Sequence, residues 1–258
     1  MISFLVDPLY IRGNFAWEDD IEDTKVIFVA SENGRFLLNN KVDLTQEWNH
    51  VEEGAKKKPL NSSIVIGVDP FDHKTVDIVD QKSMSSGGCY GFHKYDGLDS
   101  ELSETFLFEY LERPDDPDDF YEDCLMASHF FGAKVLVENN KSGFLNYFDR
   151  RGYNMWLIKP KGGKKTQRGI AAGVASKEQL AGAFASYIDK NTEKIVFPRL
   201  LNDLLDFDIQ NSTKNDATMA SGWAIVAAYR LKRTRKIAQK EDSKNDNKEF
   251  GLSNISII

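Results

Sequence analysis

The chain contains few cysteines and few histidines, the residues that most often hold zinc in proteins. Its 258 residues include two cysteines, Cys89 and Cys124, and four histidines. Two thiols are too few for a disulfide framework or a four-thiolate zinc site, and the histidines have no metal-ligand spacing with each other or with cysteine. The sequence therefore argues against a zinc-stabilised or disulfide-rich secreted domain and favours a reducing compartment.

Long apolar runs are also missing. None approaches the roughly 20 residues that a membrane helix needs, and the apolar N-terminal stretch is interrupted by Asp7 and Pro8. We therefore expect a soluble protein with no membrane partner and no signal sequence. The 41 % hydrophobic and 12 % aromatic content is enough to fill the core of one large domain or two small ones.

The formal charge is −7, from 33 basic and 40 acidic residues. This balance argues against a protein that coats nucleic acid without sequence preference. It does not exclude a nucleic-acid enzyme, because such an enzyme gathers carboxylates at a metal site and needs cations only where it holds phosphates. The cations are concentrated in the second half of the chain, in KPKGGKKTQR (159–168) and RLKRTRKIAQK (230–240).

We predict three regions along the chain. Residues 1–60 are expected to form an N-terminal extension and linker, residues 61–238 one folded domain, and residues 239–258 a flexible C-terminal tail. The boundary rests on the basic, proline-containing segment EGAKKKP, which ends the mixed polar sequence. The tail is inferred from its polar composition.

The folded region is predicted to be a mixed five-stranded sheet flanked by helices. Its first three strands should form an antiparallel meander, and the last two should pair in parallel because strand and helix alternate there. The predicted strands are 64–69, 88–95, 105–111, 134–138 and 155–159. The predicted helices are 117–131, with Asp116 as N-cap and Gly132 as its end, 142–151, one opened by a capping box from Ser176 to Gln179, 197–207, and one from about 215 to the 230s.

Three acids stand where this sheet would bring them together. Asp69 ends the first predicted strand, Glu138 ends the fourth, and Asp216 opens the last helix. Parallel strands place their carboxyl ends at one sheet edge, where open sheets build sites. Crowded carboxylates repel each other unless a cation neutralises them, and hard oxygen ligands select Mg²⁺ or Mn²⁺. Two such cations could activate water and stabilise the leaving oxygen of a phosphodiester.

Each acid also has a purely structural interpretation. An aspartate after a strand is commonly a turn residue, and Asp216 would be favourable in the first turn of its helix. Glu138 is harder to explain in this way, because a carboxylate directly after three buried apolar residues must be paired or functional. The three acids together are more specific than any one of them.

The motifs GVDP at 67–70, VLVENN at 135–140 and KNDATMASGWAIVAA at 214–228, in this order, resemble the C-terminal nuclease domain of the viral DNA-packaging terminase large subunit. That family has a ribonuclease H-like fold, and the resemblance covers about residues 60–230. It implies an endonuclease that uses two divalent cations, with Asp69, Glu138 and Asp216 as catalytic metal ligands. The family has an acidic pair at the last motif, whereas this chain has Asn215 before Asp216, so Asp72 is a candidate substitute ligand.

The resemblance also implies a biological setting. The substrate would be concatemeric double-stranded viral DNA, cut during genome packaging in the cytoplasm of an infected host cell. The partners would be a portal protein, a small terminase subunit and a packaging ATPase domain. The phosphate-binding loop of such an ATPase is missing here, since Gly162 to Thr166 has neither the required glycine spacing nor the Lys-[ST] step. The chain would then be a nuclease-domain fragment or the product of a split gene.

The basic loop around residues 159–168 has two interpretations that we weigh about equally. It is either a solvated charge run or a loop that contacts DNA phosphates. In the second case the DNA-binding residues would be Lys159, Lys161, Lys164, Lys165 and Arg168.

Two other functions remain open at this point. One is a structure-specific nuclease similar to a Holliday-junction resolvase. The other is a catalytically silent domain that holds DNA or docks to a portal, which the Asn215 departure would allow. We expect the aromatic residues at strand and helix periodicity to be core residues and not base-stacking platforms; these are Phe106, Phe108, Trp156 and Trp223.

Overall fold

The computed structural model describes residues 8–45, 58–71, 85–97, 101–159, 167–171 and 173–230. The predicted tail at 239–258 lies outside these ranges. Within them, no helix combines the length and the apolar character that crossing a membrane requires.

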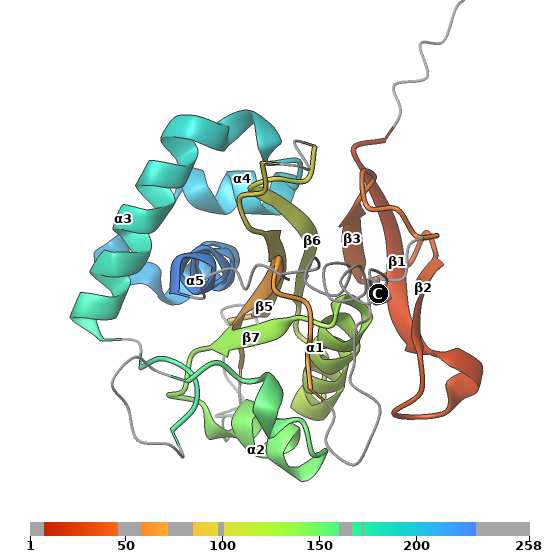
Figure 1. Cartoon of the computed structure of the whole chain (residues 1–258). Helices are drawn as coiled ribbons and strands as arrows, with labels where there is room; N and C mark the ends of the chain where they lie inside the picture. The colour runs from red at the N-terminus through yellow and green to blue at the C-terminus, as the bar shows by residue number, and fades with distance from the viewer. Residues whose placement is uncertain are drawn as a thin grey trace, which may run out of the picture.

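One mixed sheet forms the centre of the molecule, with helices on both faces (Figure 1). Its seven strands are ordered β2-β1-β3-β6-β5-β4-β7 in space. The strands are β1 (Tyr10–Trp17), β2 (Val26–Ala30), β3 (Phe36–Asn39), β4 (Ile64–Asp69), β5 (Gly87–His93), β6 (Thr105–Glu112) and β7 (Lys134–Val137). The α-helices are α1 (Pro117–Phe131), α2 (Ser142–Arg150), α3 (Val174–Asn191), α4 (Pro198–Leu205) and α5 (Asp216–Arg230). The short 3-10 helices are η1 (Glu18–Asp20), η3 (Asn154–Trp156), η4 (Thr192–Lys194) and η5 (Ile209–Lys214).

The order of the strands confirms the predicted fold class. β4, β5 and β6 form an antiparallel meander, and the chain then crosses through α1 to place β7 parallel to β4. The order β6-β5-β4-β7, in which only the last pair is parallel, is the ribonuclease H-like arrangement expected from the sequence. The carboxyl ends of β4 and β7 therefore lie side by side.

The predicted number of strands was wrong at the end beyond β7. The strand expected at 155–159 is not formed. Residues Asn154–Trp156 make the 3-10 helix η3, and Leu157 forms only an isolated bridge to β7. Trp156, Leu157 and Ile158 are buried here without a regular strand. The Trp156 ring stacks on His129 of α1 with ring centroids 5.7 Å apart.

The first part of the chain adds three strands to the sheet. β3 pairs antiparallel with β6, and β1 lies between β3 and β2. Burial of aromatic rings explains this pairing, since Phe15 and Phe36 each pack edge-on against Phe108 of β6. These strands lie inside the stretch predicted as an extension. The boundary at residue 60 itself stays a prediction, and residues 46–57 around it lie outside the described ranges.

Two helix starts test the capping predictions. α1 begins as expected, with the Asp116 side chain accepting a hydrogen bond from the Asp118 N–H at 2.9 Å, and it ends at Gly132 in the left-handed conformation. α3 begins at Val174, so the prediction that Ser176 is its N-cap was wrong. Ser176 is the third residue of the helix, and its hydroxyl accepts a hydrogen bond from the N–H of the N-cap Gly173.

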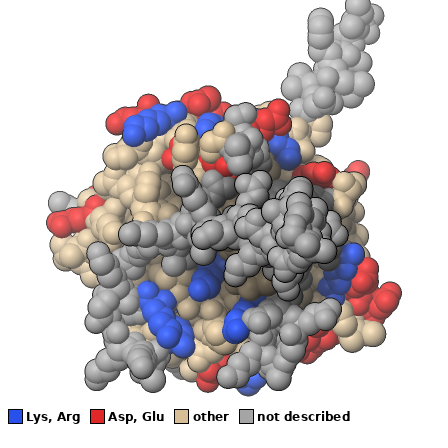
Figure 2. Space-filling view, viewed as in Figure 1, with Lys and Arg blue, Asp and Glu red and all other residues tan. Residues whose placement is uncertain are grey.

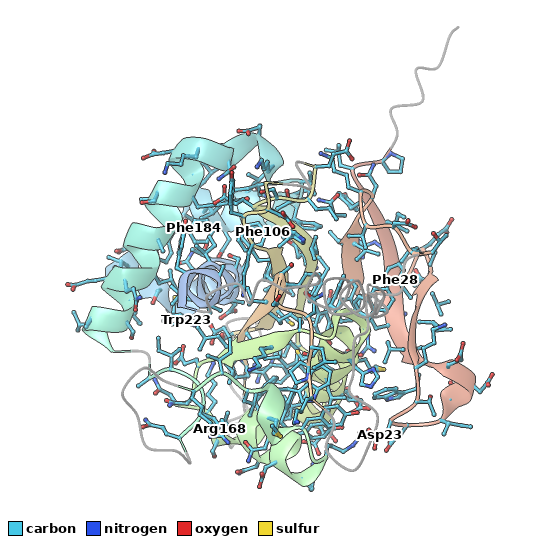
Figure 3. The ribbon with its side chains drawn as sticks, in the orientation of Figure 1. Asp23, Phe28, Phe106, Arg168, Phe184 and Trp223 are labelled. Atoms are coloured by element: carbon cyan, nitrogen blue, oxygen red, sulfur yellow. The ribbon has the colours of Figure 1, made fainter. Side chains whose placement is uncertain are left out.

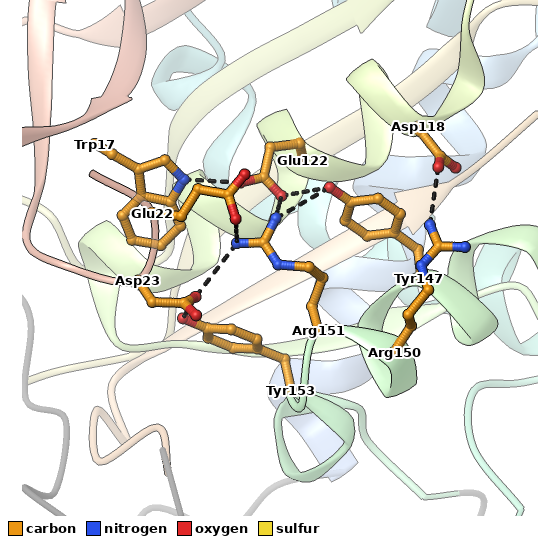
Figure 4. A network of polar contacts seen from close by, with 9 residues as sticks. All are labelled: Trp17, Glu22, Asp23, Asp118, Glu122, Tyr147, Arg150, Arg151 and Tyr153. Carbon is orange, nitrogen blue, oxygen red and sulfur yellow. Dashed lines mark hydrogen bonds and ion pairs between the residues drawn. The ribbon is translucent and has the colours of Figure 1, made fainter. Parts of the chain in front are cut away.

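Arg151, just after α2, ties the N-terminal hairpin to the helices (Figure 4). Its guanidinium donates to Glu122 of α1 at 2.6 Å and forms an ion pair with Asp23 at 3.3 Å. The Trp17 indole N–H also donates to Glu122, and the Tyr153 hydroxyl donates to Asp23. The Arg151 side chain is 14 % exposed, so these interactions are only weakly screened by water.

We predict that Arg151→Met destabilises the protein by about 2–4 kcal/mol, because it leaves the half-buried Glu122 without its cation. Arg150→Met is the matched control. Arg150 pairs with Asp118 on the surface, where both side chains are more than half exposed, and such a pair contributes less than about 1 kcal/mol. Urea denaturation of both variants provides the measurement. Equal losses of stability would contradict the assigned role of Arg151.

The two faces of the sheet carry separate cores. Ile64, Ile66 and Val68 of β4 belong to the core under α1 and α2, whereas Val65 belongs to the core under α3, α4 and α5. Since alternate strand residues point to opposite faces, Gly67 and Asp69 lie on the α5 face with Val65. Figure 3 shows Trp223 of α5 and Phe184 of α3 on this side of the sheet. The aromatic residues predicted as core are all buried; these are Phe106, Phe108, Trp156 and Trp223.

α5 packs on β4 at the distance of backbone contact. A methyl group at Gly67 would overlap the Ala220 carbonyl oxygen and the Ala224 nitrogen. One on Gly88 of β5 would lie 2.6 Å from the Asp216 carbonyl oxygen. Glycine on the strands and alanine on the helix are therefore required for this approach.

Gly67→Ala should destabilise the protein by about 1–3 kcal/mol or more, because the added methyl group overpacks a backbone contact that cannot move locally. Gly182→Ala in α3 is the control, since a methyl group there meets no atom within 4 Å. That control should stabilise the helix by about 0.5–1 kcal/mol. Thermal unfolding measures both, and an unchanged melting temperature for Gly67→Ala would contradict the tight packing of α5.

Candidate active site

Asp69 is the last residue of β4 and faces α5. Its register partner on β5 is Gly88. Because Gly88 has no side chain, the start of α5 can lie directly against the strand pair. The carboxylate is almost enclosed, with 9 % of the side chain exposed. Asp69 is thus held at the carboxyl end of a central strand, as predicted.

Glu138 follows β7 directly and lies beside Asp69. Val68 pairs with Val137 in the parallel register, and the Glu138 N–H donates to the Val68 carbonyl oxygen at 3.2 Å. Glu138 shares the α5 face with Leu136, two residues earlier on the strand. Its carboxylate accepts a hydrogen bond from the Asn140 side chain at 3.0 Å.

Asp216 is the first residue of α5, and the close contact of its backbone with Gly88 places it over the same strand ends. One carboxylate oxygen accepts a hydrogen bond from the Ser85 hydroxyl. The other accepts from the Ser86 N–H at 2.8 Å. The structure therefore brings all three predicted acids to one end of the sheet from three different elements.

Burial and mutual repulsion shape the charges of this cluster. The pKa of Asp69 is raised to about 7, mainly by burial; the charge of Lys141 lowers it, and the neighbouring carboxylates of Glu138 and Asp216 raise it. Burial also raises the pKa of Glu138 and of Asp216 above their ordinary values. Glu138 and Asp216 are thus near enough to oppose the ionisation of Asp69, which is the situation that favours binding of a cation.

Lys141 forms an ion pair with Asp69, and no motif in the sequence indicated this contact. It is the N-cap residue of α2, three residues after Glu138. Its ammonium lies 3.5 Å from Asp69 Oδ1 and donates to the carbonyl oxygen of Pro70. The spacing after Glu138 is the only signal in the sequence, and a lysine in a polar loop would ordinarily be solvated.

The donor chemistry of the cluster fits a hard divalent cation. All three side chains offer carboxylate oxygens, and Asp69 Oδ1 is buried without a hydrogen-bond partner in the described part of the chain. A separation of 3.5 Å to Lys141 is an ion pair and too long for a good hydrogen bond. Among the described residues, no three His, Cys, Asp or Glu side chains stand in a group that could hold an ion as they are placed. The roles of Asp69, Glu138 and Asp216 as ligands stay predictions.

Asn215 has a partner of its own. Its side-chain amide donates to Asp203 Oδ1 at 3.2 Å, and Asp203 Oδ2 accepts from the Thr218 N–H at 2.6 Å. Asp203 of α4 therefore caps the start of α5, a role that no motif in the sequence indicated. Asp72, the candidate substitute ligand, lies outside the described residues.

Two of the five predicted DNA-binding cations are described. Lys159 is exposed after η3. Arg168, labelled in Figure 3, donates from its Nε to the Asn154 carbonyl oxygen at 3.2 Å. Lys161, Lys164 and Lys165 lie outside the described residues, so the role of the loop stays a prediction.

No protein-family model and no curated protein matches the chain. Its fold is similar to solved phage structures. Two of them are crystal structures of the large terminase nuclease from thermophilic phage G20c, one of which has bound zinc. Each is 12 % identical, with a TM-score of 0.47, and the match covers 76 % of this chain and 90 % of that chain.

The raised pKa of Asp69 predicts a pH-dependent stability. Between its ordinary value of 3.8 and about 7, the folded protein keeps a proton that the unfolded chain has released. This contribution to stability is therefore complete at low pH and is lost as the pH rises through about 7.

We expect Asp69→Asn to stabilise the metal-free protein at pH 8, by up to about 4 kcal/mol, since each pKa unit corresponds to about 1.4 kcal/mol. The gain should shrink as the pH falls toward 4. Melting temperatures in the presence of chelator at pH 5 and pH 8 give the measurement, with the surface variant Asp118→Asn as control. A gain that is the same at both pH values would rule out this account.

Proposed function

We propose that the chain is a divalent-metal-dependent endonuclease that hydrolyses phosphodiester bonds of DNA by a two-metal mechanism. The observation that carries this proposal is the convergence of three acids: Asp69 ends β4, Glu138 follows β7 and Asp216 begins α5. They meet around Asp69 Oδ1, a buried carboxylate oxygen that has no hydrogen-bond partner in the described residues. Mg²⁺ or Mn²⁺ bound there would supply activation of water and stabilisation of the leaving oxygen.

The chain's own residues would prepare the site in three ways. Asp69, Glu138 and Asp216 would together hold the cations through their carboxylate oxygens. The hydrogen bonds from Ser85 and Ser86 fix the direction of the Asp216 carboxylate before any ligand arrives. The backbone contact of α5 with β4 and β5 packs the helix closely against the strands that carry the cluster.

Double-stranded DNA is the proposed substrate. On the face seen in Figure 2, Lys and Arg side chains lie across the lower part of the described surface, and Asp and Glu lie mostly near the outline. Lysine and arginine side chains on a surface can hold a phosphate backbone. Genome packaging in an infected host cell, with a portal protein, a small terminase subunit and a packaging ATPase as partners, is the biological role we propose for this activity.

Plasmid cleavage tests the proposal directly. We expect nicking and linearisation with Mn²⁺ or Mg²⁺, and little of either in excess chelator. Ca²⁺ should also support little cleavage, because it tolerates irregular coordination. Asp69→Asn, Glu138→Gln and Asp216→Asn should each lower the cleavage rate by about 100-fold or more. The surface variant Asp118→Asn should cleave at the wild-type rate.

The other outcomes of this experiment have clear meanings. Cleavage that persists in excess chelator would reject the metal mechanism. DNA binding without cleavage under every metal would favour a catalytically silent DNA-holding domain. A strong preference for four-way junctions over linear duplex would favour a resolvase-like activity.

A further inference from the structure

Lys141 occupies a position where a bound cation would be expected. Its ammonium stands 3.5 Å from the otherwise unpartnered Asp69 Oδ1 and is anchored by the Pro70 carbonyl oxygen. Its positive charge lowers the pKa of Asp69, Glu138 and Asp216, in each case against the larger effect of burial. Lys141 therefore interacts with all three acids. In the metal-free protein it thus provides a positive charge to an acidic cluster.

The lysine is also able to leave this position. Its side chain is 30 % exposed, and a four-carbon stem allows the ammonium to move toward water while the backbone stays at the start of α2. Neither of its contacts in the site is a charge-assisted hydrogen bond of good geometry to a carboxylate, since Asp69 Oδ1 is at ion-pair distance and Pro70 offers a neutral carbonyl.

We propose that Lys141 is a tethered cation that competes with divalent ions for the Asp69 carboxylate. It neutralises the cluster when no metal is bound, and a divalent ion that binds at Asp69 must either displace the ammonium or bind close to it. Lys141 therefore sets the concentration of metal at which the site fills. This inference rests on the proposed function, because it concerns the same carboxylates.

Repulsion between like charges explains why Lys141 should weaken metal binding. An ammonium that stays within a few ångströms of a divalent ion repels it, and moving the ammonium away breaks its interaction with Asp69. Either route weakens metal binding. Removal of the charge at position 141 should therefore tighten binding, whereas loss of a merely structural ion pair would leave the affinity unchanged or reduce it.

The test is Mn²⁺ binding to the full chain without DNA, measured by isothermal titration calorimetry at pH 8. We expect Lys141→Met to bind Mn²⁺ about tenfold more tightly than the wild type. Lys25→Met is the matched control, because it makes the same charge change on the N-terminal hairpin, where Lys25 pairs with Glu18. That variant should bind like the wild type. Asp69→Asn, alone or combined with Lys141→Met, should strongly weaken binding.

Melting temperatures provide a second measurement. In chelator, Lys141→Met should unfold at a lower temperature than the wild type at pH 8, and Mn²⁺ should raise its melting temperature by more than it raises that of the wild type. If Lys141→Met fails to fold, Lys141→Gln removes the charge, keeps a donor for the Pro70 carbonyl, and gives the same comparison.

Each remaining outcome separates this inference from the proposed function. Equal affinities for the wild type and Lys141→Met, with binding lost in Asp69→Asn, would overturn the competition and leave the metal site standing. Weaker binding by Lys141→Met would also overturn it. If no variant binds Mn²⁺, the proposed function fails, and the competition fails with it.

Discussion

The close approach of α5 to the sheet is the constraint on which the rest of the site depends. A helix is ordinarily held away from a sheet by the side chains that fill the space between them. Here glycines on β4 and β5 and alanines on α5 remove those side chains. The first residue of α5 can therefore reach the strand ends, where Asp69 and Glu138 stand. With a larger residue at Gly67 or Gly88, Asp216 would belong to a helix too far away to join them.

This constraint explains why the sequence could predict that the three acids lie at one end of the sheet. The run of small residues after Asp216 indicates a helix that packs without intervening side chains, and the short apolar strands before Asp69 and Glu138 indicate buried, adjacent elements. Because successive strand residues point to opposite faces of the sheet, Asp69 and Glu138 lie on the same face as α5. The three acids were predicted from their positions at two strand ends and one helix start, from the expected parallel pairing of those strands, and from the family resemblance of the surrounding motifs.

The parts that the sequence did not predict depend on contacts between distant segments. β1 and β3 join the sheet because Phe15 and Phe36 pack against Phe108, more than 70 residues later in the chain. No local pattern announces such a partner, and β3 is only four residues long. The failed strand at 155–159 has the same cause. The segment is apolar, as a strand would be, but Trp156 is buried in a short 3-10 helix by stacking on His129.

The fold gives a structural reason for Asn215 at the position where the resemblance predicted an acid. Its amide donates to Asp203, and the second oxygen of that carboxylate accepts a hydrogen bond from the first turn of α5. An aspartate at 215 would have no proton to donate and would face the Asp203 carboxylate at hydrogen-bond distance, next to the charge of Asp216. The partial positive charge at a helix start is about half of an elementary charge. It could not compensate three carboxylates, at 203, 215 and 216. A neutral donor at 215 is therefore the residue that lets Asp203 cap α5 and hold Asp216 in place. Its presence is explained by the helix cap and requires no loss of the carboxylate cluster.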